Sequence, residues 1–227
     1  LVARMLAREG VRTVFTLCGG HIAPIYDGCL DEGIDIVDVR HEQAAAHAAD
    51  AWARLTRGVG VALVTAGPGV TGTVTAVANA QYAGSPLVVI GGAAPRAFQG
   101  KGALQEMEQV QLLQPITKWS AAVPEVSRLP EFMARAFRIA LAGRPGPVFL
   151  EIPFDILSEF VQEENAPLPV GYKSQARLYP DPAAIAAALD LLQSAQRPLL
   201  IAGSTAYWED AGPILSELAE RWALPTY

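Results

Sequence analysis

Short apolar runs alternate with helical segments along the first two thirds of this chain. Five of the runs are rich in apolar and β-branched residues and have the length of buried strands: 11–17, 34–39, 59–65, 86–90 and 148–152. Segments with helical character lie at 22–30, 43–56, 71–83 and 129–141. Strands that alternate with helices favour a parallel sheet, because each crossover helix packs back onto the sheet. We therefore expect an α/β fold: a doubly wound, mostly parallel sheet with helices on both faces.

The pattern changes near residue 158. Residues 158–182 contain prolines and acidic residues without a sustained period, which is typical of a linker. A new unit follows, with an expected helix, strand and helix at 183–194, 198–202 and 210–222. We expect a first domain over 1–157 and the truncated beginning of a second, central α/β domain over 183–227. Since the chain opens within a helix and stops soon after this unit starts, we expect a piece of a longer polypeptide.

Composition argues against several classes of partner. The net charge is −6 and no basic cluster occurs, so we expect neither nucleic acid nor an anionic membrane as a partner. No apolar run approaches the roughly 18 residues that a membrane span needs. Hydrophobic residues make up 51% of the chain, enough for a substantial core. Cys18 and Cys29 form no disulfide framework, which favours a cytoplasmic location.

An acidic residue stands where a strand is expected to lead into a helix. The run 34–39 ends in Arg40-His41-Glu42, and an alanine-rich helix follows. Open α/β sheets bind their ligands at the carboxyl ends of strands, which makes Glu42 a candidate catalytic residue. A carboxylate at a helix N-terminus also gains about 0.3–1 kcal/mol from the helix dipole without any further role. Spacing alone leaves both interpretations open.

A glycine-rich turn follows the run 59–65. Gly67-Pro68-Gly69-Val70-Thr71-Gly72 matches G-x-G-x-x-G between a strand and a helix, as in dinucleotide-binding folds. Pro68 weakens this match because it removes an N–H group from the turn that should face a pyrophosphate. The next strand also lacks a terminal acidic residue for a ribose hydroxyl. A non-catalytic dinucleotide-binding module, or a structural segment, nevertheless stays open as an alternative.

Other common sites find little support. His21, His41 and His47 do not have the spacing of a helical metal site, and we expect no protein-bound metal here. No G-x-S-x-G motif indicates a serine hydrolase.

Several longer motifs occur together in one order. They resemble the N-terminal pyrimidine-binding domain of thiamine-diphosphate enzymes of the acetolactate synthase group, over about residues 1–157. The remainder resembles the start of that family's central domain. The motifs are Gly19-Gly20, Arg40-His41-Glu42-Gln43-Ala44-Ala45, Val64-Thr65-Ala66-Gly67-Pro68-Gly69, Gly102-Ala103-Leu104-Gln105-Glu106, Pro115-Ile116-Thr117-Lys118, Gly143-Arg144-Pro145-Gly146-Pro147-Val148 and Ile152-Pro153-Phe154-Asp155.

The resemblance implies roles for individual residues. Glu42 matches the glutamate that hydrogen-bonds N1′ of the cofactor's aminopyrimidine and thereby promotes formation of the thiazolium ylide. Gln105 matches a glutamine that faces the substrate, and both residues are implied to be catalytic. Other cofactor contacts are implied at Gly19, Gly20, Gly67 and Pro68. His21 is a possible substrate-side residue and Lys118 matches a family position, although ordinary structural roles for these two stay open.

The resemblance also implies what the whole protein does. It indicates an acetolactate synthase-like transferase or lyase that acts on 2-oxo acids such as pyruvate, as in branched-chain amino acid biosynthesis. The implied cofactors are thiamine diphosphate and Mg²⁺, and FAD occurs in some relatives. The Mg²⁺ ligands belong to a C-terminal domain with a Gly-Asp-Gly motif that this sequence lacks. The active site would lie between subunits of a homodimer or dimer of dimers, and the segment alone is expected to be inactive.

Three positions depart from the pattern of true acetolactate synthases. Cys18, within Thr16-Leu17-Cys18-Gly19-Gly20-His21, and Leu104 both resemble the branch related to 2-hydroxyacyl-CoA lyases. Gly72 stands where many relatives carry an asparagine beside the cofactor pyrimidine. These departures leave the substrate open between a 2-oxo acid and a 2-hydroxyacyl-CoA.

Overall fold

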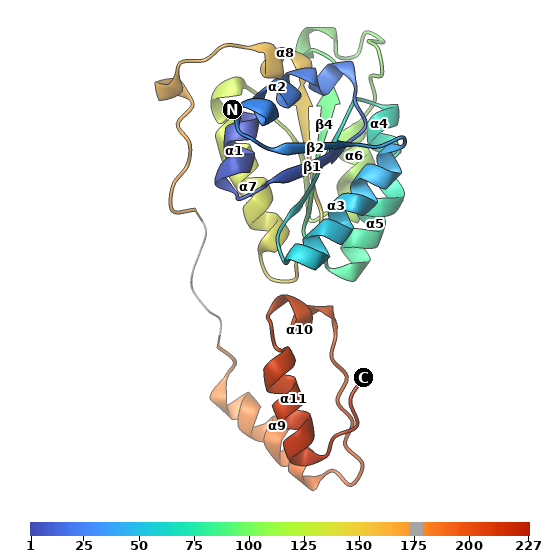
Figure 1. Ribbon diagram of the computed structural model, residues 1–227, viewed down its shortest axis with the longest axis vertical. Coiled ribbons are helices and arrows are strands. Elements are labelled where there is room, and N and C mark those ends of the chain that lie inside the picture. Colours follow the sequence, from blue (N-terminus) through green and yellow to red (C-terminus); the bar gives the residue numbers. More distant parts are fainter. Residues whose placement is uncertain (173–178) are drawn as a thin grey trace. The chain divides into compact units, whose positions relative to one another are not determined.

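The chain divides into two units, of which the first carries the sheet (Figure 1). The computed structural model describes residues 1–172 and 179–227, and the first unit spans Leu1–Tyr172. Residues 173–178, in the middle of the expected linker, lie outside the described residues. No helix in the described ranges has the length and apolar character that crossing a membrane requires.

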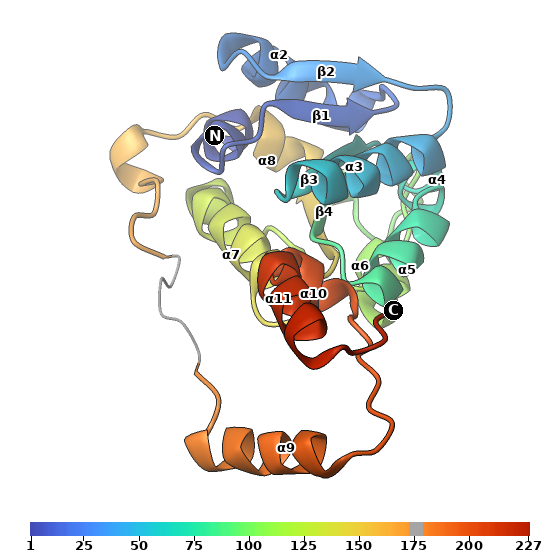
Figure 2. The same ribbon diagram turned by 60° about the horizontal axis from the view of Figure 1, so that its bottom comes forward.

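Six parallel strands form the sheet of the first unit, in the order β2-β1-β3-β4-β6-β5. Figure 2 shows β2 at the edge, next to β1. The bounds are β1 Thr13–Thr16, β2 Asp35–Asp38, β3 Gly60–Val64, β4 Leu87–Ala93, β5 Trp119–Ala122 and β6 Val148–Pro153. The expected doubly wound parallel α/β sheet is therefore confirmed.

Helices cover both faces of this sheet, as Figure 1 shows for α1 and α7 on one side and α3 and α5 on the other. Alternate strand residues face the two layers: Val61 and Leu63 join the first core cluster, and Ala62 and Val64 join the second. The first layer contains α1 Val2–Arg8, α2 Ala23–Asp31 and α7 Leu129–Leu141. The second contains α3 Glu42–Thr56, α5 Val74–Ala83 and α6 Gln109–Leu113.

The alanines of α3 bring its backbone directly against the sheet. Its inner face is made of small residues that are fully buried: Ala45, Ala46, Ala49 and Ala53. A Cβ atom at Gly60 of β3 would lie 1.9 Å from the Ala49 carbonyl oxygen, so glycine is required there. Asp50, also buried, accepts hydrogen bonds from Arg54 and from Asn79 of α5. These contacts fix α3 relative to both β3 and α5.

Two sequence-based boundaries in the first unit are wrong. β4 does not end at Ile90 but continues through Gly91 and Gly92. These glycines do not end the strand: they are needed within it because other chain segments lie against it at these positions. A Cβ atom at Gly92, for example, would lie 2.5 Å from the Cβ of His21. The expected helix 71–83 is instead two helices, α4 Pro68–Thr71 and α5.

Three apolar residues within the expected linker contact the core of the first unit. Val161, Leu168 and Tyr172, which follow α8 Phe154–Ser158, are partly buried against the first core cluster. Tyr172 also donates a hydrogen bond to Glu9, and Arg4 forms an ion pair with Glu163. These apolar contacts were hidden in the sequence because they have no regular period.

The second unit contains α9 Pro182–Ser194, α10 Ser204–Trp208 and α11 Gly212–Trp222. The expected strand 198–202 is reduced to a single parallel bridge between Leu200 and Thr226. The backbone of residues 198–202 pairs with the last residues of the chain and with no other described segment, so no extended strand forms. The short helix α10 was not expected from the sequence.

Replacing Gly60 by alanine should destabilise the first unit, because the new methyl group would overlap the α3 backbone. We expect the free energy of unfolding to fall by about 3 kcal/mol, the upper end for overpacking of a core. Urea denaturation followed by circular dichroism measures this change. Gly58→Ala is the control: its new methyl would meet only Thr56 Oγ1, at 3.4 Å, and a loss equal to that of Gly60→Ala would contradict the explanation.

Candidate functional site

The loops at the carboxyl ends of the strands gather the candidate residues at one edge of the sheet. The strand order reverses between β1 and β3, which is the switch point where open α/β sheets bind ligands. The two loops at this point are in close contact. A Cβ atom at Gly19, after β1, would lie 2.3 Å from the Cβ of Thr65, after β3. Gly20 has no such neighbour within 4 Å.

Glu42 is the first residue of α3 but not its cap. The cap is His41, whose Nδ1 accepts the N–H of Gln43 at 3.0 Å. The Glu42 carboxylate is partly buried, and none of the described residues forms a hydrogen bond or ion pair with it. The requirement for a helix cap is thus met by the neighbouring residue, and the carboxylate is available to a ligand.

The Glu42 carboxylate lies against the glycine-rich turn. Cβ atoms at Gly69 and Gly72 would lie 3.7 Å from its Oε1 and 3.0 Å from its Oε2. Because Gly69 and Gly72 have no side chains, they leave the carboxylate uncovered on that side. Many relatives carry an asparagine at position 72. Here glycine leaves room for the Glu42 side chain, which lies where a side chain at this position would begin.

Gly67 at the start of this turn has a backbone that other residues adopt rarely. Its φ is 57° and its ψ is −108°, and a Cβ atom there would lie 2.5 Å from the carbonyl oxygen of Gln105. Its N–H already donates to Gln109 Oε1 at 2.6 Å. Three features disfavour binding of a dinucleotide pyrophosphate at this turn. The Gly67 N–H is already bonded, Pro68 has no N–H, and the negative Glu42 carboxylate lies beside the turn. The geometry counts against a pyrophosphate site.

A second group of side chains lies beside the first. His21 Nδ1 lies 3.3 Å from Thr65 Oγ1, and this hydroxyl lies 3.5 Å from Gln105 Oε1. Burial lowers the pKa of His21, and a hydrogen bond with Gln105 partly opposes that shift. The imidazole is therefore neutral at pH 7, when it can accept as well as donate a hydrogen bond. The sequence reasoning did not select Thr65, although it lies within one of the recognised motifs.

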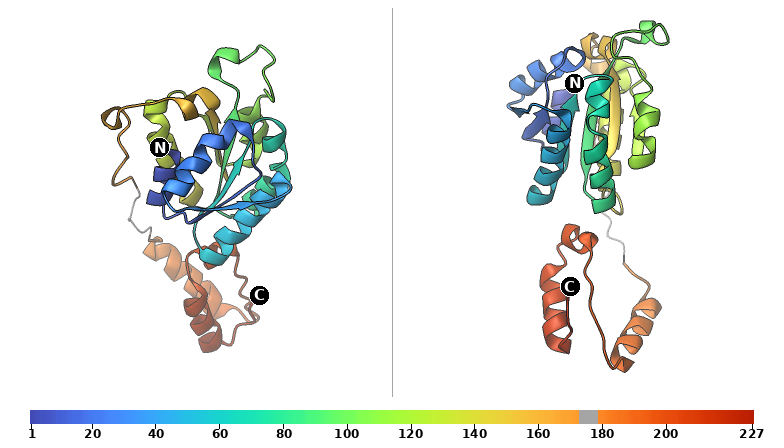
Figure 3. Two further views of the ribbon diagram at one scale, coloured as in Figure 1. Left: turned by 45° about the horizontal axis from the view of Figure 1, so that its top comes forward. Right: turned by 90° about the vertical axis from the view of Figure 1, so that its right-hand side faces the viewer.

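The loop that carries Gln105 is closed by a carboxylate (Figure 3 shows this green loop projecting from the first unit). Glu106 accepts hydrogen bonds from the N–H groups of Gly100 and Ala103. These backbone bonds lower the pKa of Glu106. Gln105 itself has a φ of 59°, in the left-handed region that non-glycine residues rarely adopt. The loop thus holds Gln105 in one specific conformation.

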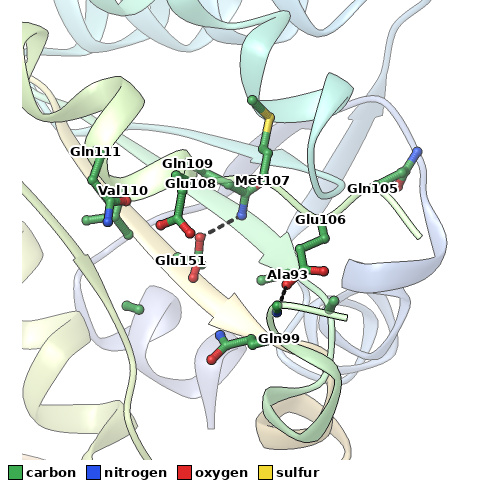
Figure 4. A pocket seen from close by; sticks show the side chains of 13 residues that line it. Ala93, Gln99, Gln105, Glu106, Met107, Glu108, Gln109, Val110, Gln111 and Glu151 are labelled. Carbon is green, nitrogen blue, oxygen red and sulfur yellow. Dashed lines mark hydrogen bonds between the residues drawn. The ribbon is translucent and has the colours of Figure 1, made fainter. Parts of the chain in front are cut away.

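Behind this loop lies a polar pocket of about 320 Å³ (Figure 4). Gln105, Gln109 and Glu151 are among the residues that line it. Burial raises the pKa of Glu151, the bond from Gln109 lowers it in part, and the charge of Glu108 raises it again. Sequence reasoning missed Glu151, although a lone acid within the apolar strand β6 is a signal in itself.

Lys118 lies away from these groups. It precedes β5, at the amino ends of the parallel strands, whereas Glu42 follows β2 at the carboxyl ends. Its ammonium group donates to the carbonyl oxygens of Ile139 and Ala142 at the end of α7. Burial lowers its pKa. These hydrogen bonds support a structural role for Lys118. Its position at the opposite ends of the strands keeps it away from a ligand bound at Glu42.

Metal ligands do not gather at this edge. Within the described ranges, no three His, Cys, Asp or Glu side chains are close enough to hold a metal ion.

This chain is similar in sequence to a known family domain and to several known proteins. Residues 1–112 match the family described as thiamine pyrophosphate enzyme, N-terminal TPP binding domain. A probable acetolactate synthase of Mycobacterium bovis is 40% identical over 227 residues, 99% of this chain and 41% of that protein. The 2-hydroxyacyl-CoA lyase 2 proteins of Danio rerio and Homo sapiens are 54% and 49% identical over 168 residues, 73% of this chain and 27% of each lyase.

This chain thus spans about two fifths of the acetolactate synthase and about a quarter of each lyase. The matched family domain contains Glu42, the glycine-rich turn and Gln105, the residues that the structure brings to one edge of the sheet. The chain therefore belongs to the thiamine pyrophosphate enzymes, and its first unit contains the N-terminal TPP binding domain of that family.

Proposed function

We propose that the first unit supplies the pyrimidine-binding half of a thiamine-diphosphate-dependent active site, with residues 1–157 as the functional domain. The observation that carries the proposal is the Glu42 carboxylate, which is unpaired among the described residues and lies beside two glycines of the turn, Gly69 and Gly72. A helix N-terminus with a free carboxylate suits a group that exchanges a proton with it. It does not suit an anion, which the carboxylate would repel.

The residues present fit the cofactor's aminopyrimidine. Gly69 and Gly72 leave space beside Glu42 that a Cβ atom at either position would narrow, and Pro68 and Gly67 provide an apolar surface next to it. Gly19 contributes close packing with Thr65 on the other side of the switch point. We assign cofactor contacts to Glu42 and to the backbone of these turns.

The chain's own groups then have distinct tasks. When bound, thiamine diphosphate supplies the electron sink for making or breaking a bond beside a carbonyl carbon. Glu42 holds the proton that is shared with the aminopyrimidine ring, and a partly buried carboxyl is well placed to do so. Gln105 orients the substrate through its amide, and Thr65 and the neutral His21 restrict how that amide turns.

For the whole protein we propose an acetolactate synthase-like carboligase or lyase that acts on 2-oxo acids such as pyruvate. The match that supports this covers nearly the whole chain, 99% of it, at 40% identity. A 2-hydroxyacyl-CoA lyase is the second candidate. It is favoured by the higher identity, 49–54%, over the 168 residues shared with the lyases of Homo sapiens and Danio rerio.

Several further properties follow from the same proposal. Mg²⁺ would be held by a C-terminal domain, and residues 183–227 would begin a central domain in which some relatives bind FAD. The complete site would lie between subunits of a homodimer or dimer of dimers. We further propose a cytoplasmic enzyme, and for the synthase a role in branched-chain amino acid biosynthesis.

Glu42→Gln in the full-length protein should slow proton exchange at C2 of bound thiamine diphosphate by about 100-fold or more, because an amide cannot exchange the proton. Hydrogen–deuterium exchange of the cofactor, followed by NMR after acid quenching, measures this rate. Glu164→Gln, at an exposed position, is the control and should leave the rate unchanged. Equal rates for Glu42→Gln and the unmodified protein would refute the role of Glu42.

The two substrate classes can be separated with the full-length protein. We expect acetolactate from pyruvate, measured by its colorimetric product after decarboxylation. Cleavage of a 2-hydroxyacyl-CoA instead, detected by chromatography of the CoA thioesters, would assign the lyase activity. Inactivity toward both substrates with thiamine diphosphate bound would contradict both assignments.

A further inference from the structure

One buried side chain joins two strands of the sheet to the turn that follows a third. Gln109, the first residue of α6, is only 1% exposed. Its Oε1 accepts the N–H of Gly67 at 2.6 Å, just beyond β3. Its Nε2 donates to the Gly92 carbonyl of β4 at 2.9 Å and to Glu151 Oε2 of β6 at 2.7 Å. Figure 4 shows Gln109 and Glu151 joined in this way behind the loop.

Chemistry fixes the orientation of this amide. The Gly67 N–H can only donate and the Gly92 carbonyl can only accept. Exchanging the oxygen and nitrogen of Gln109 would place two donors together at Gly67 and two acceptors together at Gly92. Both hydrogens of the amide nitrogen are used as well, one for Gly92 and one for Glu151. The three bonds therefore define a single arrangement.

Two partners of Gln109 lie directly beside candidate site residues. Gly67 begins the turn on which the Glu42 carboxylate rests, and Gly67 also lies against the backbone of Gln105. A Cβ atom at Gly92 would lie 2.5 Å from the Cβ of His21 and 3.0 Å from its backbone. One amide thus ties together the backbone segments that support both groups of side chains at the edge.

The bond at Gly67 matters most for geometry. Glycine can adopt several backbone conformations, and the left-handed φ of Gly67 is only one of them. A hydrogen bond to its N–H is therefore needed to hold this peptide in place. Without Gln109, the buried N–H of Gly67 and carbonyl of Gly92 lose their partner. Unpaired groups of this kind are costly, and the backbone shifts to pair them elsewhere.

We propose that Gln109 is a positioning residue for the reaction: by fixing the Gly67 turn it sets the place of the Glu42 carboxylate and the backbone of Gln105. This inference rests on the proposed function of Glu42. Gln109 does not itself reach the Glu42 carboxylate, since its three bonds go to Gly67, Gly92 and Glu151. It acts through the backbone.

The test is Gln109→Met in the full-length protein, which keeps the side-chain length and removes all three bonds. Amide hydrogen exchange at Gly67, read by mass spectrometry in the absence of cofactor, should become about tenfold faster. kcat and the rate of C2 proton exchange should both fall about 10- to 100-fold, as expected for a small displacement of reacting groups. KM should change much less.

Gln111→Met is the matched control. Gln111 lies two residues further along α6, is exposed, and lines the same pocket. It should leave amide exchange at Gly67 and kcat as they are. If Gln109→Met behaves like Gln111→Met in either measurement, the proposal is overturned.

Gln109→Glu is a second variant that separates positioning from simple loss of stability. Its carboxyl keeps an oxygen for the Gly67 N–H and can share a proton with Glu151, as paired buried carboxyl groups do. The Gly67 amide should stay protected, and kcat should recover to a value between those of the Gln109→Met and unmodified proteins. A protected Gly67 amide together with a kcat as low as that of Gln109→Met would contradict the proposal.

The Glu42→Gln variant keeps this inference distinct from the proposed function. If Glu42→Gln leaves C2 exchange unchanged, the proposed function fails whatever Gln109 does. If Glu42→Gln abolishes the exchange but Gln109→Met matches its control, only the positioning role is wrong.

Discussion

The contact between the α3 backbone and β3 determines where the Glu42 carboxylate lies. Because alanines line the inner face of α3 and Gly60 has no side chain, the backbone of the helix lies directly against the backbone of β3. The buried Asp50, bonded to Arg54 and Asn79, holds the helix against α5. The first turn of α3 is thereby fixed above the carboxyl edge, with Glu42 facing the glycine-rich turn. A larger residue in this interface would move the helix and its carboxylate together.

The sequence predicted the fold well because the strands alternate with helices and the central strands β3, β4 and β6 are buried apolar runs. It predicted less well where glycines serve packing. Gly91 and Gly92 look like a strand end but lie inside β4, since Val70 and His21 press against them. The single bridge at Leu200 shows the opposite error: an apolar run resembles a strand, yet a strand needs neighbours to pair with.

The candidate site was predictable only in part. Glu42 and Gln105 came from motif resemblance, and spacing alone left Glu42 between cap and catalyst. In the structure His41 caps α3 and Glu42 does not, and the catalytic role of Glu42 stays a proposal. Gln109 was beyond sequence reasoning, since a glutamine in an irregular segment gives no sign that it is buried and bonded to two strands and to the turn after a third. Long-range hydrogen bonds of this kind leave no local pattern.

The left-handed backbone of Gln105 has a consequence for how such a protein diversifies. Few amino acids tolerate this conformation, and fewer still also present an amide, so few replacements would keep both properties at this position. Its neighbour Leu104 is 77% exposed and adopts an ordinary backbone conformation. Substitutions at residue 104 are therefore open to selection without disturbing the frame that holds residue 105. The loop thus combines one position whose backbone restricts replacement with a neighbour that can vary freely, so its surface can change while the conformation of residue 105 is kept.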